Sequence, residues 1–238
     1  MKTETKKFLL ELNGFWEHPD GEELFRQAFS KVDHQRREKI RRVKEERGRA
    51  ASLGAGLLLQ YALWTAGDGQ TPEELAEGGL EVCTVPLLLK EIPEPMPLEY
   101  GCGEHGKPYL INSPWHFNLS HSGDYVLCAL SRREVGADIQ IERKKNVKKI
   151  AERFFSEEEN RMLKQSEDEN ADFFRLWTRK EAYGKLTGEG LAGVLGINLQ
   201  EEGEIYGGLC WEEYDMPKGY RIALCQYKDM RKQECKRI

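Results

Sequence analysis

The chain has 238 residues, of which 39% are hydrophobic and 32% are charged, and its formal net charge is −5. This length and composition predict a globular protein with one large domain or two small ones. A net negative charge argues against a nucleic-acid partner, because phosphate contacts need a clustered excess of Lys and Arg. No stretch approaches the roughly 18 consecutive apolar residues of a membrane helix, so we expect no membrane partner either.

Cysteine usage and the amino-terminal segment indicate the compartment. Six cysteines occur and none forms a CxxC pair, which argues against a zinc knuckle or a thioredoxin-like motif. Residues 1–14 lack the apolar core of a signal peptide. We therefore expect reduced thiols and a cytoplasmic location.

The first half of the chain is predicted to be mainly helical. Residues 35–49 carry eight Lys and Arg against three Glu, and they lead into apolar residues at helical spacing, so the pattern predicts one long helical region over 35–66. A loop with a short helix is expected over 67–81. The segment 86–110 is rich in Pro and Gly and is expected to be irregular, with one short strand.

Strands and helices follow in the central part of the chain. Residues 117–120 and 125–131 are predicted strands around a His-Ser-Gly-Asp turn, and residues 135–142 alternate as a third strand. Helices are then predicted over 147–154, after the capping box formed by Ser156 and Glu159, and over 171–186 with a stop at Gly188.

A weak internal repeat suggests a duplicated architecture. The segment GDYVLCALSRR (123–133) is similar to GYRIALCQYKD (219–229), and each is a strand after a glycine turn. We predict an α+β fold of two similar halves, residues 1–133 and residues 134–238, with the metal site described next in the second half.

Two groups of polar residues could carry chemistry. Asp138, Gln140 and Glu142 share one face of the strand 135–142, which pattern alone favours as a solvated edge but which also suits a magnesium platform. Glu181 and Lys185 stand four residues apart on the helix 171–186. They form either an ordinary Glu–Lys pair or a carboxylate for a metal beside a cation for a phosphate, and spacing alone leaves both open.

Two common phosphate and hydrolase motifs are missing. The glycines at 188–190 follow a helix, but no GxxxxGK[ST] loop occurs. His121 lies between Ser120 and Ser122, but without a GxSxG motif a Ser–His hydrolase is disfavoured.

Five stretches together resemble the Sfp-type 4'-phosphopantetheinyl transferase family, in the family's order and at its spacing. They cover most of residues 105–192 and are GKPYL (106–110), FNLSHSGDY (117–125), VGADIQIE (135–142), RFFSEEE (153–159) and WTRKEAYGKLTGEGL (177–191). The resemblance implies two halves related by a pseudo-twofold axis, with coenzyme A in the cleft between them. It further implies Mg²⁺-dependent transfer of 4'-phosphopantetheine from coenzyme A to a serine of an apo acyl or peptidyl carrier protein, with release of 3',5'-ADP. Two fused halves predict a monomer.

The resemblance also implies roles for individual residues. Asp138 and Glu181 match metal ligands, and Glu181 also matches the general base. Lys185 matches a lysine on the pyrophosphate. The remaining matches line the nucleotide and its phosphates: Lys107, Ser120 and His121, with Arg36 and Lys39 at the 3'-phosphate.

One departure from the family pattern concerns the metal. Many members read DIE where this chain reads Asp138-Ile139-Gln140. An amide is a poorer magnesium ligand than a carboxylate, so we expect Asp138 and Glu181 to suffice, with Gln140 behind them or bound through water, and Glu142 as a weaker substitute.

Carrier docking and three alternative functions stay open at this point. Docking is expected near Phe154, Phe155 and the segment 157–176, yet that segment is acidic, whereas an acidic carrier helix calls for a basic surface. The alternatives are a catalytically impaired coenzyme A-binding homologue, another magnesium-dependent phosphotransferase, and a structural protein whose acidic strand face is merely solvated.

Overall fold

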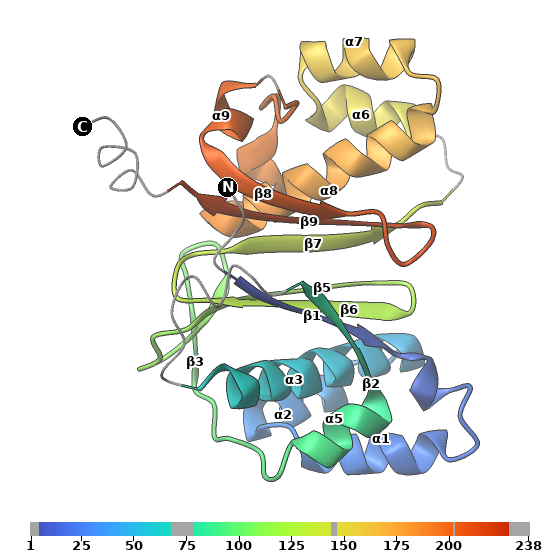
Figure 1. Ribbon diagram of the computed structural model, residues 1–238, viewed down its shortest axis with the longest axis vertical. Coiled ribbons are helices and arrows are strands. Elements are labelled where there is room, and N and C mark those ends of the chain that lie inside the picture. Colours follow the sequence, from blue (N-terminus) through green and yellow to red (C-terminus); the bar gives the residue numbers. More distant parts are fainter. Residues whose placement is uncertain (1–4, 68–78, 144–146, 202, 229–238) are drawn as a thin grey trace.

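Two β-sheets lie face to face at the centre of the molecule, with helices on both outer sides. The structure is a computed structural model that describes residues 5–67, 79–143, 147–201 and 203–228. Figure 1 shows four layers in the order helix, sheet, sheet, helix, so the predicted α+β class is confirmed. The strand orders are β2-β1-β6-β5 in the first sheet and β7-β9-β8 in the second.

The first sheet is built around a strand near the amino terminus. Strand β1 (Thr5–Glu11) runs parallel to β2 (Leu80–Thr84) and antiparallel to β6 (Tyr125–Ser131). The edge strand β5 (His116–Ser122) pairs antiparallel with β6. Sequence analysis missed β1, because its apolar run is only the three residues Phe8–Leu10 and two lysines precede it.

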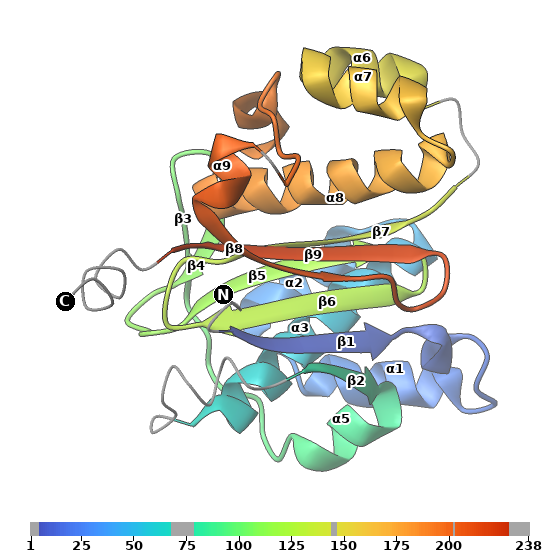
Figure 2. The ribbon, with the colours of Figure 1, turned by 45° about the horizontal axis from the view of Figure 1, so that its top comes forward.

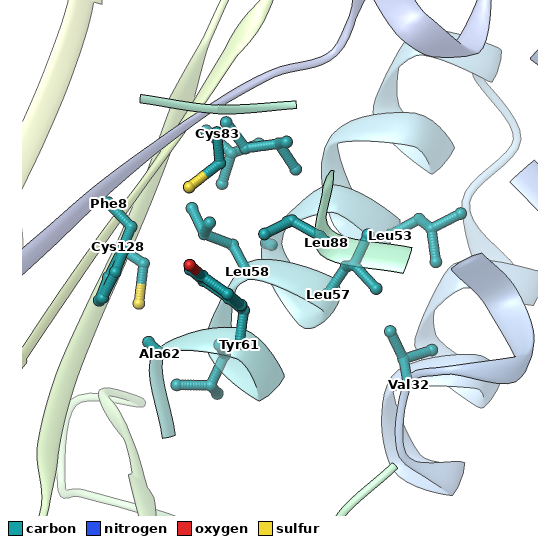
Figure 3. Packing of buried hydrophobic residues seen from close by; sticks show 14 of the residues in the cluster. Phe8, Val32, Leu53, Leu57, Leu58, Tyr61, Ala62, Cys83, Leu88 and Cys128 are labelled. Atoms are coloured by element: carbon teal, nitrogen blue, oxygen red, sulfur yellow. The ribbon is translucent and has the colours of Figure 1, made fainter. Parts of the chain in front are cut away.

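One face of this sheet is covered by helices α1 (Gly21–Ser30), α2 (His34–Arg42), α3 (Glu46–Ala66) and α5 (Val85–Glu91). Figure 3 shows Leu58 and Tyr61 of α3 among the side chains packed near Phe8 and Cys128 of the sheet. The rings of Phe8 and Tyr61 meet edge to face with centroids 5.4 Å apart.

The single helical region predicted over 35–66 is wrong, because the chain breaks between α2 and α3. Val43 has extended backbone angles and ends α2. The carboxylate of Glu45 then accepts hydrogen bonds from the backbone N–H groups of Arg47 and Gly48, which caps a new helix. The break turns the basic helix α2 away from the axis of the buried helix α3.

The segment 86–110, predicted to be irregular with one short strand, is more ordered than expected. It contains most of α5 and a hairpin of β3 (Tyr100–Cys102) and β4 (Pro108–Leu110). Thr84 caps α5 by accepting from Leu87 N, and a proline stands in its first turn. Most of the predicted short helix within 67–81 falls outside the described residues.

The second sheet carries the outer helix α8. Strands β7 (Gly136–Ile141) and β8 (Leu209–Tyr214) both pair antiparallel with β9 (Tyr220–Tyr227), and α8 (Glu169–Thr187) lies across them (Figure 2). A Cβ at Gly136 would stand 1.9 Å from the carbonyl oxygen of Ala182, so only glycine allows the strand and the helix to approach this closely.

The predicted capping elements of the second half are confirmed. Helix α6 (Lys148–Phe154) precedes α7 (Glu157–Gln165), and Ser156 and Glu159 form the predicted capping box at the start of α7. Helix α8 ends at Gly188, whose φ of 83° is left-handed. Short helical turns η1 (Asn13–Phe15), η2 (Gly190–Val194) and α9 (Glu204–Gly207) complete the described elements.

The centre of the interface between the sheets is apolar, and a buried ion pair lies beside it. Leu9 and Leu127 of the first sheet belong to the same buried cluster as Ile139 and Leu224 of the second. At its edge, Lys7 Nζ of β1 lies 2.9 Å from Glu212 Oε2 of β8. Strands β1 and β6 are therefore covered on both faces, which ties the sheets into one body.

The two sheets share a strand order. In the first sheet β1, β6 and β5 are neighbours in that order, and β7, β9 and β8 repeat it in the second. The similar segments 123–133 and 219–229 contain the corresponding middle strands, β6 and β9. The pseudo-twofold relation and the boundary between residues 133 and 134 stay predictions.

Two further expectations concern cysteines and membranes. Five cysteines lie in the described ranges and all are free thiols, four of them buried. Among the helices of those ranges, none combines the length and the apolarity that crossing a bilayer requires.

Candidate functional site

A cavity of about 620 Å³ opens between helices α2 and α3, the β3–β4 hairpin, strand β5 and the end of α8. The structure brings six residues selected from the sequence to its wall: Arg36, Lys39, Lys107, Ser120, His121 and Lys185. They come from α2, the β3–β4 hairpin, β5 and α8, which are far apart along the chain. Its volume falls in the range of ordinary ligand pockets, about 300–1,000 Å³.

The wall formed by α2 is strongly basic. Among the described residues no carboxylate lies within salt-bridge distance of Arg36 or Lys39. Burial lowers the pKa of Lys39, and the charge of Arg36 lowers it further. Two like charges that share a concave surface without a counterion favour an anionic ligand, since a bound phosphate would relieve their repulsion.

Asp138 lies just behind the opposite wall. Its side chain is 2% exposed, and its Oδ1 accepts hydrogen bonds from Ser120 Oγ and from Lys185 Nζ, each at 2.6 Å. Lys185 Nζ also donates to Ser120 Oγ at 2.8 Å. The second oxygen, Oδ2, accepts from Gln140 Nε2 at 2.9 Å. One buried carboxylate thus joins β5, β7 and α8.

Alternate residues of β5 fasten this strand to β7. Asn118 Oδ1 accepts from the backbone N–H of Ala137 at 3.3 Å, and Ser122 Oγ accepts from that of Ile141 at 3.0 Å. Ser120 stands between them and reaches Asp138. Sequence analysis did not select Asn118 or Ser122 for this role, although the period-two run of polar residues in FNLSHS was the available signal.

Glu181 lies one helical turn before Lys185 on α8. Burial raises the pKa of Glu181 to about 7, the nearby charge of Asp138 raises it as well, and Lys185 acts in the opposite direction. The two carboxylates selected as metal ligands are therefore close enough to repel each other. Strand β7 and helix α8 contact each other through Asp138 and Lys185, and joint metal binding by Asp138 and Glu181 stays a prediction.

The remaining acidic residue of the strand face is engaged elsewhere. Glu142 Oε1 pairs with Arg221 Nε, so the carboxylate expected as a weaker substitute ligand already has a cation. Asp138 is buried, which contradicts the reading of this strand face as a merely solvated edge. Gln140, which is half-buried, hydrogen-bonds to Asp138 as a neighbour of the carboxylate.

The residues present fit one magnesium ion. Within the described ranges, no three or more His, Cys, Asp or Glu side chains converge as a metal cage. Magnesium needs no such cage, because one or two carboxylates with waters and substrate phosphates usually suffice. Asp138 and Glu181 are near enough for the charge of one to raise the pKa of the other, and a divalent cation held by both would relieve this repulsion.

His121 and Lys107 also line the cavity. Burial lowers the pKa of His121, and the positive charge of Lys185 lowers it further, so a neutral imidazole faces the cavity at pH 7. Lys107 Nζ donates to Glu134 Oε2 at 2.5 Å and to the Leu186 carbonyl oxygen at 3.2 Å. Lys107 therefore holds the hairpin against the end of α8 as well as lining the cavity.

We expect the replacement Glu181→Gln to stabilise the metal-free protein in a pH-dependent manner. In the unfolded chain Glu181 loses its proton near pH 4.5, but the folded protein keeps it until about pH 7, so the wild type loses stability as the pH rises through this window. The neutral amide removes this loss, about 1–2 kcal/mol at pH 8 after allowance for solvent screening. Urea unfolding with EDTA measures it, and an equal gain at pH 4.5 and pH 8 would contradict the assignment.

Comparison with known proteins points to one family. Residues 134–225 match the family model of the 4'-phosphopantetheinyl transferase superfamily. The chain is 35% identical over 141 residues to 4'-phosphopantetheinyl transferase Sfp of Bacillus subtilis (strain 168), covering 54% of this chain and 62% of that protein. It is 36% identical over 146 residues to 4'-phosphopantetheinyl transferase AcpT of Salmonella typhimurium, covering 59% of this chain and 72% of that protein.

Other relatives carry the same name. A 4'-phosphopantetheinyl transferase of Bacillus subtilis is 34% identical over 145 residues, which are 56% of this chain and 64% of that protein. The match thus spans somewhat less than two thirds of the two Bacillus subtilis proteins and more than two thirds of the Salmonella one. The matched region includes the strand and the helix that bring Asp138 and Glu181 together, and the chain belongs to the 4'-phosphopantetheinyl transferase superfamily.

Proposed function

We propose that this protein transfers 4'-phosphopantetheine from coenzyme A to a serine of an apo acyl or peptidyl carrier protein in a magnesium-dependent reaction. The observation that carries the proposal is one cavity with two sides of different chemistry. Its α2 wall is basic and has no carboxylate partner among the described residues, and its opposite wall includes Lys185, which hydrogen-bonds to the buried Asp138 near Glu181. A dianionic phosphate suits the first region, and a metal-bound diphosphate suits the second. The relatives described above are named 4'-phosphopantetheinyl transferases, and this name agrees with the proposed reaction.

The donor is held through its charges. Arg36 and Lys39 bind the terminal 3'-phosphate, and Lys185 and the neutral imidazole of His121 donate hydrogen bonds to the diphosphate. Asp138 and Glu181 would hold a magnesium ion, which would supply positive charge to offset the diphosphate and the leaving group. The Lys185 ammonium, hydrogen-bonded to Asp138, is oriented toward the region where that charge develops.

The acceptor serine attacks the phosphorus that bears the pantetheine arm. A new bond forms between the serine oxygen and this phosphorus, and the bond from phosphorus to the bridging oxygen breaks, so that 3',5'-ADP leaves. Glu181 accepts the serine proton, directly or through a water that it orients. General-base assistance of this kind contributes about 10²–10⁴-fold.

The proposal is tested by incubating the protein with coenzyme A, Mg²⁺ and an apo carrier protein. Intact-mass spectrometry of the carrier should show the gain of one phosphopantetheine arm, with an equal amount of 3',5'-ADP released. Coenzyme A binding without a mass gain would favour the impaired homologue. Transfer of phosphate alone to the carrier would favour another phosphotransferase.

Gln140 is expected to contribute little to the reaction. Its amide hydrogen-bonds to Asp138 Oδ2, so Gln140→Ala removes a neighbour of the ligand rather than the ligand. We expect a loss in kcat of less than about tenfold, because this hydrogen bond to a charged group, worth about 1.5–3 kcal/mol, is present in the ground state as well as in the transition state. Gln140→Glu restores a carboxylate and should keep wild-type activity. A loss for Gln140→Ala as large as that for Asp138→Ala would contradict the two-carboxylate site.

The carrier is proposed to dock on α6 rather than α7. The exposed residues of α6 are mostly basic with one apolar side chain among them: Lys148, Lys149, Ile150, Glu152 and Arg153. The first turn of α7 is acidic, and Phe155 is buried, so neither suits an acidic carrier helix. The basic exposed side of α6 supports docking there instead of on the acidic segment 157–176.

Charge reversal on α6 should weaken carrier recognition specifically. Lys149→Glu is expected to raise KM for the carrier at least about threefold without changing kcat, because an exposed charge contributes up to about 1 kcal/mol and acts on encounter. Lys164→Glu makes the same charge change at an exposed position of α7 and is the control. Equal effects of the two replacements would place docking elsewhere.

A further inference from the structure

Arg36 does not simply project from α2; its side chain lies in a notch of α3. A Cβ at Gly56 would stand 2.6 Å from Arg36 Cγ and 3.1 Å from Arg36 Cδ. The missing side chain of Gly56 therefore makes the room through which the arginine stem passes to the cavity. An alanine there would push the stem aside, because the contact is closer than packed carbon atoms allow.

A buried carboxylate and a tyrosine hold the same residue from the other side. Asp33 is 4% exposed, and its Oδ1 accepts the backbone N–H of Arg36 at 2.9 Å. Its Oδ2 accepts the Tyr100 hydroxyl at 2.9 Å. Burial and the charge of Asp33 raise the pKa of Tyr100, and the nearby positive charge of Arg36 acts in the opposite direction.

Tyr100 connects two walls of the cavity. It begins the hairpin β3–β4, whose turn supplies His105 and Lys107 to the cavity, while Asp33 and Arg36 belong to α2 on the other wall. The Tyr100 ring also packs edge to face on Phe117, with centroids 6.2 Å apart. The Tyr100 side chain is therefore held at two points: its hydroxyl by Asp33 and its ring by Phe117.

We propose that Tyr100, Asp33 and Gly56 are positioning residues that fix the Arg36 guanidinium in the cavity and thereby set the preference for a donor nucleotide that carries a phosphomonoester. The inference rests on the proposed function, since the phosphomonoester meant is the 3'-phosphate of coenzyme A. An arginine held in place loses little side-chain entropy when it binds, so the phosphate gains more from it than from a free side chain.

Binding of coenzyme A and of 3'-dephospho-coenzyme A, measured by calorimetry, separates positioning from folding. In Tyr100→Phe the ring stays and the hydroxyl is lost. We expect the Kd for coenzyme A to rise about 5- to 30-fold, less than for the full loss of a hydrogen bond to a charged group because Tyr100 acts on the phosphate only through Arg36, and the Kd for the dephospho form to change less than twofold. Gly56→Ala should show the same selective loss. The kcat at saturating coenzyme A should stay near the wild-type value.

Two controls test whether the effect is specific. Tyr109→Phe changes a half-exposed tyrosine on the neighbouring strand of the same hairpin. Gly54→Ala introduces a comparable close contact on α3, with Leu12 Cδ2 at 2.5 Å instead of Arg36. Both should keep the ratio of the two dissociation constants, even though Gly54→Ala lowers the melting temperature.

The outcomes distinguish this inference from the proposed function. A wild type that prefers coenzyme A, with a preference that shrinks in Tyr100→Phe, supports the inference. An unchanged preference in Tyr100→Phe overturns it and leaves the proposed function intact, as does a wild type that binds both nucleotides equally. A wild type that binds neither nucleotide overturns both.

Discussion

Asp138→Ala is expected to lower kcat for phosphopantetheine transfer by at least about 100-fold, the usual cost of removing one charge-stabilising group from an active site. The carboxylate is the point at which Ser120, Lys185 and Gln140 meet, and it is one of the two proposed metal ligands. Its loss removes the metal and also releases the Lys185 ammonium. Single-turnover transfer to an apo carrier protein measures the effect.

The replacement Asp138→Asn separates the loss of metal binding from the loss of the hydrogen bond that holds Lys185. The amide oxygen can still accept from Ser120 or Lys185, but the negative charge that a divalent cation needs is gone. We therefore expect Asp138→Asn to be nearly as inactive as Asp138→Ala while melting close to the wild type. If Asp138→Asn kept most of the activity, the carboxylate would serve to orient Lys185 and not to hold a metal.

Glu159→Ala is expected to lower the free energy of unfolding by about 3–5 kcal/mol, the cost of breaking a buried ion pair by removing one partner. Glu159 Oε2 lies 2.8 Å from Lys180 Nζ, and both side chains are fully buried. The same carboxylate closes the capping box of α7 with Ser156 N and accepts Leu199 N at 2.9 Å. Urea unfolding measures the loss.

The control and the compensating variant make this prediction specific. Glu157→Ala removes an exposed glutamate from the same turn of α7 and should cost less than about 1 kcal/mol. Burial lowers the pKa of Lys180, so this lysine is unfavourably placed without Glu159. Adding Lys180→Met to Glu159→Ala should recover part of the loss. If the double variant were less stable than Glu159→Ala alone, the unpaired charge of Lys180 would not be the cause of the lost stability.

Sequence analysis predicted the second half of the fold better than the first. The capping box at Ser156 and the glycine stop at Gly188 are local signals, and local geometry was enough to place α7 and α8. Strand β1 gives no such signal, because Lys7 is buried only through its pair with Glu212, a residue of the other sheet. A long-range ion pair cannot be inferred from the charged residue alone.

The contrast between local signals and long-range contacts also applies to the residues of the candidate site. Glu181 and Lys185 share a helix face, and their meeting with Asp138 follows from the resemblance of two motifs. The bond between Tyr100 and Asp33 joins residues 67 positions apart, and neither belongs to a recognised motif. Positioning contacts of this kind depend on the packing of α2 against the hairpin, which no local pattern encodes.

The most direct test of the account is a crystal structure of this protein with Mg²⁺ and coenzyme A. We predict one metal ion about 2.0–2.1 Å from an oxygen of Asp138 and an oxygen of Glu181, with diphosphate oxygens completing its coordination. The 3'-phosphate should lie against Arg36 and Lys39. A metal ion bound away from β7 and α8, or a nucleotide outside the cavity between them and α2, would contradict the central claim.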